Sequence, residues 1–261
     1  MTDRGETGAM PAAAQVAVVT GGSSGIGLAA VGVLAARGMR VAAIARDRKR
    51  LDDALGTLDA RHRGRTAGVT ADVRRESDVA AAVAEIAARF GRIDVLVNCA
   101  GGSMRARRRL VDTTSEEWQR LIDTNLTGTY LMCRAVLPHL QAAGGGYILN
   151  VLSTAAFRAG EGGSLYAASK FGARALTEAL IAEYRHSEIR ITSVSPGPVD
   201  TAIWDRKLTP PPPEERARML RPSDIADIFA WLLDRPSRVH IPDITVVPWP
   251  GAAESQGRPA R

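Results

Sequence analysis

Short β-branched or alanine-rich apolar runs alternate with longer segments of helical spacing along most of this chain. Runs of this length and composition predict buried β-strands. Because strands that alternate with crossover helices pair in parallel, the runs predict one continuous parallel sheet. The predicted strands are Gln15–Thr20, Val41–Ala45, Thr66–Val69, Ile93–Asn98, Tyr147–Leu152, Ile189–Val194 and Ile244–Val247.

The segments between the strands carry apolar side chains at the three- and four-residue spacing of a helix. The alternation predicts a single doubly wound α/β domain over residues 14–250, with a parallel seven-stranded sheet and helices on both faces. Residues 1–13 and 251–261 are expected to be a flexible leader and a flexible tail. The helical stripes are Ile26, Ala30, Val33 and Leu34; Val79, Val83, Ile86 and Phe90; Trp118, Leu121, Ile122, Leu126 and Tyr130; and Phe171, Ala175, Leu176 and Leu180.

Length and composition agree with one large domain. The chain has 261 residues, 45% of them hydrophobic, which is enough to bury a sizeable core. No apolar run approaches the roughly 20 residues of a membrane span, so no membrane partner is expected. The leader lacks the apolar core of a signal peptide. Cys99 and Cys133 are the two cysteines, too few for a disulfide framework, which predicts a cytoplasmic protein.

A net charge of +6 raises the question of a nucleic-acid partner. Basic residues are spread along the predicted helices among acidic ones, and the one dense cluster, Arg105–Arg109, has no interleaved aromatic residues. We therefore expect no nucleic-acid partner. Solvated loop charge is the favoured interpretation of the cluster, and contact with an acidic substrate is the alternative.

A glycine-rich segment joins the first predicted strand to the first predicted helix. Its glycines permit a tight turn and a close approach of the backbone to a pyrophosphate, and the helix N-terminus offers unpaired N–H groups to the phosphates. A glycine cluster alone can be a simple turn, but this position predicts the dinucleotide loop of a Rossmann-type fold. The residues predicted to bind a cofactor here are Thr20, Gly21, Ser23, Ser24, Gly25, Ile26 and Gly27.

The end of the second strand indicates which dinucleotide binds. An NAD site has a carboxylate there for the ribose 2′-hydroxyl, whereas this chain has Ala45 followed by Arg46. A guanidinium at this place can bind a 2′-phosphate, so NADP(H) is the predicted cofactor. Asp47 is a rival carboxylate but stands where the next helix needs an N-cap.

Two further strand ends carry candidate cofactor contacts. Asp72 and Val73 close the third strand, where a side chain can reach the adenine amino group; a simple turn aspartate is the alternative. Asn98, Ala100 and Gly101 end the fourth strand, where small residues let the backbone lie against the cofactor. The cysteine between them is expected to pack rather than to react.

Tyr166 and Lys170 lie one helical turn apart, so their side chains share a helix face. A cation there is expected to lower the tyrosine pKa from about 10 toward neutral pH and to make Tyr166 a proton donor or acceptor for a carbonyl/alcohol couple. Ser153 follows the fifth strand, where its hydroxyl can polarise a substrate carbonyl.

Asn125 lies on the same stripe as Trp118, Leu121 and Ile122 and should face inward, where its amide needs hydrogen-bond partners. From the residues alone, a satisfied core amide and a functional amide are equally good interpretations. The segment Pro196–Thr201 follows the sixth strand at the carboxyl edge of the sheet, where ligands bind in open α/β folds.

In order and spacing these residues resemble the short-chain dehydrogenase/reductase family over roughly residues 14–250. Cys99 is a departure, because asparagine is more usual there. The motifs that carry the resemblance are Thr-Gly-x-x-x-Gly-x-Gly at 20–27, Asn-x-Ala-Gly at 98–101, Asn125, Ser153, Tyr-x-x-x-Lys at 166–170 and Pro-Gly-Pro-Val-Asp-Thr at 196–201.

The resemblance implies a role for each catalytic candidate. Tyr166 would protonate the alkoxide in reduction, Lys170 would lower its pKa and hold the nicotinamide ribose, and Ser153 would polarise the carbonyl. Asn125 would bend its helix and hold a water that links Lys170 to solvent. Homo-oligomers, either tetramers or dimers, are usual in the family, through the fourth and fifth helices and the C-terminal strand. The last predicted cofactor contacts are Pro196, Gly197, Val199 and Thr201.

The expected substrate is a small molecule with a carbonyl or alcohol group. Residues 201–222, called the substrate loop from here on, are placed to close over it, and a plain connecting loop is the alternative. Ser153, Tyr166, Phe157 and Trp204 are the predicted substrate contacts, with Leu165 and Ile203 adding apolar surface.

Two other functions are weighed against this one, and no metal site is predicted. A non-catalytic NADP-binding regulatory protein would have no reason to combine the four catalytic candidates. A halide-releasing lyase of this fold would lack the glycine-rich dinucleotide loop, which this chain contains. Both alternatives are therefore less favoured than an oxidoreductase.

Overall fold

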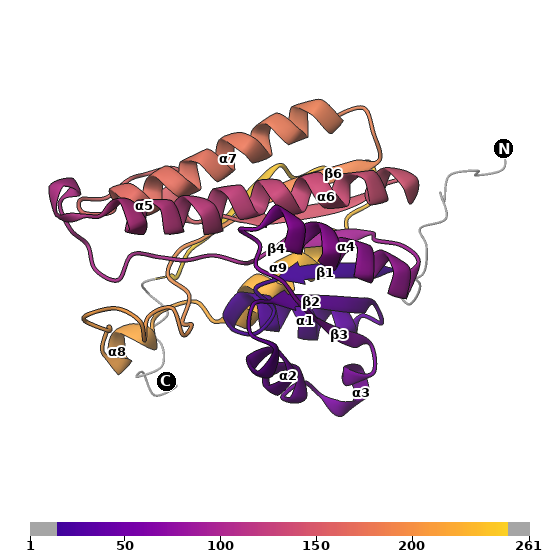
Figure 1. The fold of residues 1–261 in the computed structure, drawn as a ribbon, viewed down its shortest axis with the longest axis horizontal. Helices are drawn as coiled ribbons and strands as arrows, with labels where there is room; N and C mark the ends of the chain where they lie inside the picture. Colours follow the sequence, from indigo (N-terminus) through magenta and orange to yellow (C-terminus); the bar gives the residue numbers. More distant parts are fainter. Residues whose placement is uncertain (1–14, 250–261) are drawn as a thin grey trace, which may run out of the picture.

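A computed structural model describes residues 15–249 of the chain. Those residues form a seven-stranded sheet in the order β3-β2-β1-β4-β5-β6-β7, and every neighbouring pair is parallel (Figure 1). The predicted doubly wound α/β fold is confirmed, whereas the predicted leader and tail lie outside the described residues. The strands are β1 (Val16–Thr20), β2 (Arg40–Ala45), β3 (Thr66–Thr70), β4 (Val95–Asn98), β5 (Gly146–Val151), β6 (Ile189–Pro196) and β7 (Asp243–Val246).

Helices connect successive strands, as parallel pairing requires. The principal helices are α1 (Gly25–Ala36), α2 (Arg48–Gly56), α4 (Glu76–Phe90), α5 (Ser115–Ile122), α6 (Gly128–Ala142), α7 (Ser164–Tyr184) and α9 (Pro222–Leu233). The shorter segments are α3 (Ala60–Arg63), α8 (Pro213–Arg216), the 3₁₀ turns η2 (Leu110–Asp112) and η4 (Thr154–Ala156), and the π-helical η3 (Asp123–Thr127).

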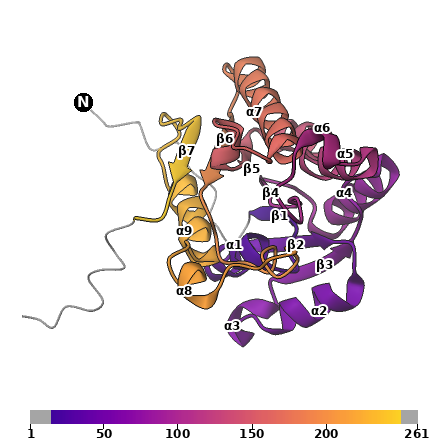
Figure 2. The same cartoon turned by 90° about the vertical axis from the view of Figure 1, so that its left-hand side faces the viewer.

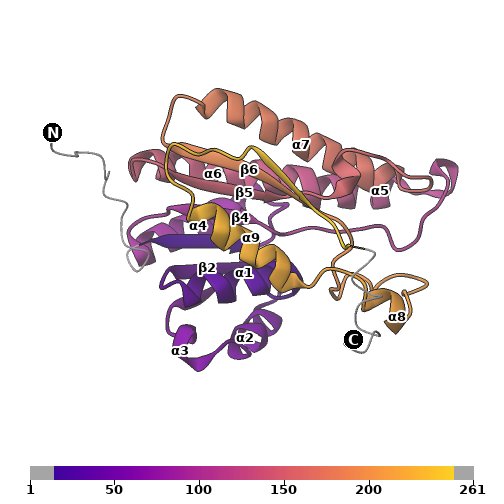
Figure 3. The ribbon, with the colours of Figure 1, turned by 180° about the vertical axis from the view of Figure 1, so that it is seen from behind.

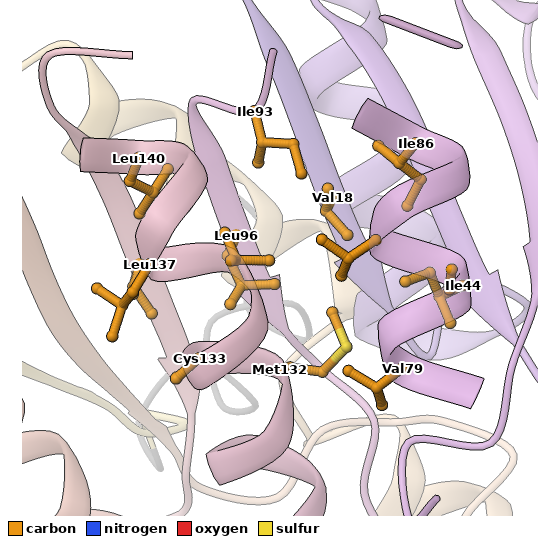
Figure 4. Close-up of a cluster of buried hydrophobic side chains, with 14 of the residues drawn as sticks. Val18, Ile44, Val79, Ile86, Ile93, Leu96, Met132, Cys133, Leu137 and Leu140 are labelled. Atoms are coloured by element: carbon orange, nitrogen blue, oxygen red, sulfur yellow. The ribbon is translucent and has the colours of Figure 1, made fainter. Parts of the chain in front are cut away.

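Side chains of the strands alternate between two cores, because successive residues of a strand point to opposite faces. Val16 and Val18 of β1 face the layer of α4, α6 and α7, whereas Ala17 and Val19 face the layer of α1, α2 and α9 (Figures 2 and 3). Figure 4 shows the first core, where Leu96 of β4 lies among side chains of α4 and α6. Helices therefore cover both faces of the sheet.

Strand boundaries differ from the predicted ones by one or two residues at most ends. The largest extension is at β6, which continues past the predicted Val194 because Ser195 and Pro196 pair with Thr245 and Val246 of β7. Ser195 and Pro196 are not apolar strand residues, so the sequence pattern did not predict that the strand includes them. The end of β6 is determined by pairing with a strand about 50 residues later.

Three aromatic residues on the predicted apolar stripes are not core residues. Trp118, Tyr130 and Phe171 are 42%, 43% and 41% exposed on α5, α6 and α7. The buried side of α7 runs through smaller residues, among them Ala167 and Ala173, at three- and four-residue spacing. A periodic stripe can be wider than the face that packs on the sheet, and these aromatic residues lie on its margin.

The strand order reverses between β1 and β4. The chain leaves β1 toward β2 on one side, and β4 pairs with the other side of β1. In open α/β sheets such a reversal leaves a crevice at the carboxyl ends of the strands. The loops after β4, β5 and β6 reach the same end of the sheet, as does the substrate loop with α8 (Figure 1).

Candidate active site

A cavity of about 770 Å³ lies at the carboxyl ends of the strands. This volume is within the usual range of ligand pockets. The predicted residues that line it are Gly21, Ser24, Gly25, Ile26, Gly27, Ala100, Gly101, Ser153, Tyr166, Lys170, Pro196, Gly197, Val199, Thr201 and Trp204. The predicted residues outside its wall are Thr20, Ser23, Arg46, Asp72, Val73, Asn98, Asn125 and Phe157.

The glycine-rich segment forms one end of the cavity, and three of its glycines, Gly22, Gly25 and Gly27, have no room for a side chain. A Cβ on Gly27 would lie 2.3 Å from the carbonyl oxygen of Gly21, so the first turn of α1 rests directly on the preceding loop. Gly25 has a φ of +51°, and a Cβ there would lie 2.9 Å from Cγ2 of Thr201. The helix N-terminus is thereby kept open toward the cavity, as a phosphate-binding turn requires.

The hydroxyl of Thr20 holds two strand ends together. Its Oγ1 accepts hydrogen bonds from the backbone N–H groups of Cys99 at 3.1 Å and Ala100 at 3.0 Å. The side chain of Asn98 points away from the cavity and donates to Oδ1 of Asn150 at 2.9 Å. Thr20 therefore fixes the spacing of β1 and β4 beneath the cavity, and the Asn98 amide belongs to the core.

The ends of β2 and β3 lie beyond the cavity wall. Arg46 is exposed at the end of β2, and the carboxylate of Asp47 accepts from the N–H of Arg50 at 3.0 Å, which confirms the predicted N-cap. Asp72 forms an ion pair with Arg74, whose guanidinium holds the pKa of that carboxyl below its usual value. Val73 is buried and packs against Gly128.

The cavity wall brings together the three side chains predicted to act on the substrate, which are Ser153, Tyr166 and Lys170. Lys170 is 6% exposed, and its Nζ donates to the carbonyl oxygen of Val151 at 3.0 Å. The same Nζ lies 6.0 Å from the centre of the Tyr166 ring. The predicted spacing of the two side chains on one face of α7 is thus the observed one.

Burial decides the pKa values of both catalytic candidates. It lowers the pKa of Lys170 to about 8, because a charged ammonium loses its hydration. It raises the pKa of Tyr166, and the interaction with Ser153 lowers that pKa by a smaller amount. The expectation that Lys170 would bring the Tyr166 pKa below 10 is therefore wrong. The loss of hydration raises this pKa by more than the neighbouring Ser153 lowers it.

Asn125 lies in the π-helical segment η3 and is 1% exposed. Its Oδ1 accepts from the N–H of Gly102 at 2.7 Å, and its Nδ2 donates to the carbonyl oxygen of Gly102 at 3.0 Å. Nδ2 also donates to Oγ of Ser169 at 2.9 Å, which in turn donates to the carbonyl oxygen of Tyr166 at 2.7 Å. The inward orientation was predicted, and the π-helical geometry agrees with the local bend that the resemblance implied.

Three loops are joined over the cavity. The Nζ of Lys207 donates to Oγ of Ser103 at 2.8 Å and to the carbonyl oxygen of Met104 at 2.5 Å. The N–H of Leu208 donates to the carbonyl oxygen of Arg105 at 2.9 Å. The loop after β5 joins through the N–H of Arg108, which donates to Gly162 at 3.1 Å. The substrate loop is therefore attached to the loop after β4.

Two predicted apolar contacts lie elsewhere. The ring of Phe157 is 39% exposed and stacks 4.1 Å from the guanidinium carbon of Arg174, outside the cavity wall. Leu165 is 1% exposed and packs with Met104 and Leu121 in a separate small cluster. Both follow Ser153 closely in sequence, but the turn η4 and the start of α7 direct them away from the cavity.

The structure also adds residues that the sequence did not single out. Ser169 connects Asn125 to the backbone of Tyr166, and no motif marks it. Arg158, Arg206 and Lys207 line the cavity together with Arg107. Of these cations, only Arg107 belongs to the basic cluster that the sequence analysis considered as a contact for an acidic substrate.

Among residues 15–249, no group of three or more His, Cys, Asp or Glu side chains is placed to hold a metal ion. No helix in that part of the chain combines the length and apolar character needed to cross a membrane.

Comparison with known proteins places this geometry in a family. A profile with the description short chain dehydrogenase matches residues 15–210. The 2-(R)-hydroxypropyl-CoM dehydrogenase of Xanthobacter autotrophicus is 39% identical over 198 residues, which cover 76% of this chain and 79% of that enzyme.

Solved structures give the same result. An alcohol dehydrogenase from the archaeon Thermococcus sibiricus, complexed with 5-hydroxy-NADP, has a TM-score of 0.79 at 31% identity and covers 88% of this chain and 95% of its own. A variant of actinorhodin polyketide ketoreductase with NADPH has a TM-score of 0.80 at 31% identity, over 90% of this chain and 96% of its own. Since the matched segment contains the glycine-rich loop, Ser153 and the Tyr166–Lys170 turn, this chain belongs to the short-chain dehydrogenase/reductase family of oxidoreductases.

Proposed function

We propose that this protein is an NADP(H)-dependent oxidoreductase that interconverts a ketone or aldehyde and an alcohol, with Tyr166 as the general acid/base. The observation that carries the proposal is one cavity whose wall contains the glycine-rich loop at one end and Ser153, Tyr166 and Lys170 at the other. A cofactor phosphate and a reacting carbonyl can both be reached from that space.

The residues of this chain fit a dinucleotide. The open turn at Gly25 and Gly27 would receive the pyrophosphate, and Arg46 at the end of β2 would bind a 2′-phosphate. Lys170 would hold the nicotinamide ribose, with Pro196 and Thr201 beside the nicotinamide. When bound, the cofactor supplies or accepts the hydride. The solved relatives that contain NADP or NADPH support this cofactor.

Proton transfer is assigned to the side chains of α7 and the end of β5. Because burial raises the pKa of Tyr166, the phenol keeps its proton at neutral pH and can donate it to the developing alkoxide during reduction. Ser153 would donate a hydrogen bond to the same oxygen and polarise the carbonyl. Asn125 would hold the Tyr166 end of α7 in place through Ser169.

The wall that would receive the substrate is partly apolar and partly enclosed. Met104, Ile203 and Trp204 line it, and Nε1 of Trp204 donates to the carbonyl oxygen of Val199 at 2.9 Å, which orients the indole. The substrate loop would exclude water from the reacting centre, because its attachment to the loop after β4 covers the cavity.

Assembly and location are part of the same proposal. The large apolar side chains exposed on α5, α6 and α7 support a homo-oligomer, a dimer or a tetramer, in which a second copy covers them. A cytoplasmic location agrees with two free cysteines.

A screen of NADPH consumption across ketones, aldehydes and quinones tests the reaction. We expect turnover of at least one carbonyl class and a loss of about 10²–10⁴-fold in Tyr166→Phe. Near-normal turnover in that variant would remove Tyr166 from the mechanism. Quenching of NADPH fluorescence separates the alternatives: binding without any turnover favours a regulatory protein, and no binding favours a lyase.

A further inference from the structure

The cavity wall carries an excess of positive charge on the side of the reacting groups. Besides Lys170, its cations are Arg107 from the loop after β4, Arg158 from the loop after β5, and Arg206 and Lys207 from the substrate loop. Glu215 is the one carboxylate that residues 15–249 contribute to the wall. These four cations belong to the loops around Ser153 and Tyr166, whereas the glycine-rich loop and Arg46 belong to β1 and β2.

None of the four cations forms an ion pair with a carboxylate within residues 15–249, although many other arginines there do. The Arg107 guanidinium donates a long hydrogen bond of 3.4 Å to the carbonyl oxygen of Glu161. Lys207 bonds to a hydroxyl and a carbonyl oxygen, which occupy two of its three N–H donors without neutralising its charge. The positive charge of these side chains is therefore not balanced by a neighbouring carboxylate of the described residues.

Lys207 is half-buried and lies close enough to Arg107 for the two charges to repel each other. Burial lowers the pKa of Lys207, and the charge of Arg107 lowers it further. Holding like charges together in a partly desolvated wall costs free energy unless an anion neutralises them. A basic wall inside a cavity also concentrates anionic ligands.

The arginines of the basic cluster at 105–109 have different surroundings in the structure. Arg108 pairs with Glu117, and Arg105 and Arg109 are exposed and lie outside the cavity wall. Arg107 is the member of the cluster that enters the wall. Arg107 is exposed as well, but unlike Arg105 and Arg109 it lines the cavity.

We propose that the substrate carries an oxyanion, such as a carboxylate, which Arg107 and Lys207 bind while its carbonyl lies at Ser153 and Tyr166. The inference rests on the proposed oxidoreductase function and adds the substrate class to it. Met104, Ile203 and Trp204 would contact an apolar link between the two ends of the substrate.

Matched pairs of keto acids and methyl esters test the proposal. The probes are acetoacetate, 4-oxopentanoate and 5-oxohexanoate, each beside its methyl ester, with NADPH oxidation as the readout. We expect the best acid to exceed its ester by at least about 10-fold in kcat/KM, which charge-assisted hydrogen bonds can supply. Added salt should reduce turnover of the acid more than that of the ester.

Substitutions in the cavity wall test whether Arg107 and Lys207 cause the preference for the acid over the ester. Arg107→Gln should lower kcat/KM for the acid about 10- to 100-fold and leave the ester within about twofold. Lys207→Gln should lower kcat/KM for both substrates, because Lys207 also ties the substrate loop to the loop after β4, but by a factor at least about 10-fold larger for the acid. Arg105→Gln and Arg109→Gln are the matched controls, since they remove the same charge outside the cavity, and they should leave the preference for the acid unchanged. The dissociation constant of NADPH should be the same in all four variants.

The outcomes separate this inference from the proposed function. Equal turnover of acid and ester by the unmodified protein, or equal losses on both in Arg107→Gln, would overturn the anion site while leaving the oxidoreductase intact. If no carbonyl is reduced, the proposed function fails, and calorimetric binding of 4-oxopentanoate to the protein with NADP⁺ still decides the anion site. Absent binding, or equal binding by Arg107→Gln, would then overturn it.

Discussion

Asn125 pairs with both backbone groups of Gly102, accepting from its N–H at 2.7 Å and donating to its carbonyl oxygen at 3.0 Å. One side chain thus joins the π-helical segment before α6 to the loop after β4. Its remaining donor continues through Ser169 to the backbone of Tyr166. The candidate acid/base is therefore positioned by a residue 41 positions earlier in the chain, counted from 125 to 166.

Replacing Asn125 by alanine should weaken the fold as well as the site. The change leaves the N–H and carbonyl of half-buried Gly102 without their partner, at a cost of about 1–3 kcal/mol. Urea unfolding measures the difference. Gln119→Ala is the control, because it removes an exposed hydrogen bond to Asp123 in the same helical region and should change stability by about 0.5 kcal/mol or less. Equal stabilities for the two variants would contradict this assignment.

A methyl group at Gly27 should disturb the cofactor end of the cavity. Its Cβ would lie 2.3 Å from the carbonyl oxygen of Gly21, so the loop or α1 must shift, at a cost of about 1–3 kcal/mol. We expect Gly27→Ala to bind NADPH at least about 10-fold more weakly in a fluorescence titration.

Gly32→Ala provides the comparison on the same helix. A Cβ at Gly32 meets Cδ2 of Leu58 at 3.4 Å, an ordinary contact, and alanine favours helix by about 0.5–1 kcal/mol. That variant should be at least as stable as the unmodified protein and should bind NADPH normally. Weakened binding in Gly32→Ala would show that α1, rather than the turn at Gly27, is the sensitive element.

Lys170 should make stability depend on pH in a defined window. Below pH 8 its ammonium is protonated in both the folded and the unfolded chain; between about 8 and 10.5 the folded chain loses the proton first. The unfolded chain then binds more protons, so stability rises with pH through this window. From pH 7 to 9.5 the free energy of unfolding should rise by about 2 kcal/mol relative to Lys170→Met.

The measurement stops at pH 9.5 because Tyr166 acts in the opposite direction above it. Burial raises the pKa of that phenol, so the unfolded chain loses the phenol proton first and stability falls as pH rises beyond about 10. Denaturant unfolding of both proteins at pH 7 and 9.5 gives the comparison. A constant difference between them would mean that the Lys170 pKa is not lowered.

Arg46 should determine the preference for a phosphorylated cofactor. Arg46→Ala is expected to raise the dissociation constant of NADPH about 10-fold or more and to leave that of NADH nearly unchanged, because only the first carries a 2′-phosphate. Arg50→Ala, which removes an exposed arginine one turn into α2, is the control. A similar loss for both cofactors in Arg46→Ala would place the 2′-phosphate elsewhere.

The local sequence pattern was enough to predict the elements that carry the catalytic candidates. Tyr166 and Lys170 lie on one face of α7, as predicted, because both belong to a single continuous helix whose geometry does not depend on distant contacts. The N-cap at Asp47 and the inward orientation of Asn125 were predictable for the same reason. The boundary of β6 was not, because it depends on pairing with β7.

Side chains outside regular elements were harder to place. Phe157 was predicted as a substrate contact and Leu165 as apolar pocket surface, but neither side chain lines the cavity. Lys207 gave no signal at all, because its place in the cavity wall depends on hydrogen bonds to Ser103 and Met104, about 100 residues earlier.

By itself, the sequence determined the fold class, the order of strands and helices along the chain, the glycine-rich turn and the shared face of Tyr166 and Lys170, because all of these follow from local periodicity and steric size. Only the tertiary structure decided which arginine of the basic cluster enters the cavity and in which direction the Tyr166 pKa moves. The first depends on how loops that are distant in sequence come together around the cavity, and the second depends on how far burial removes the phenol from water.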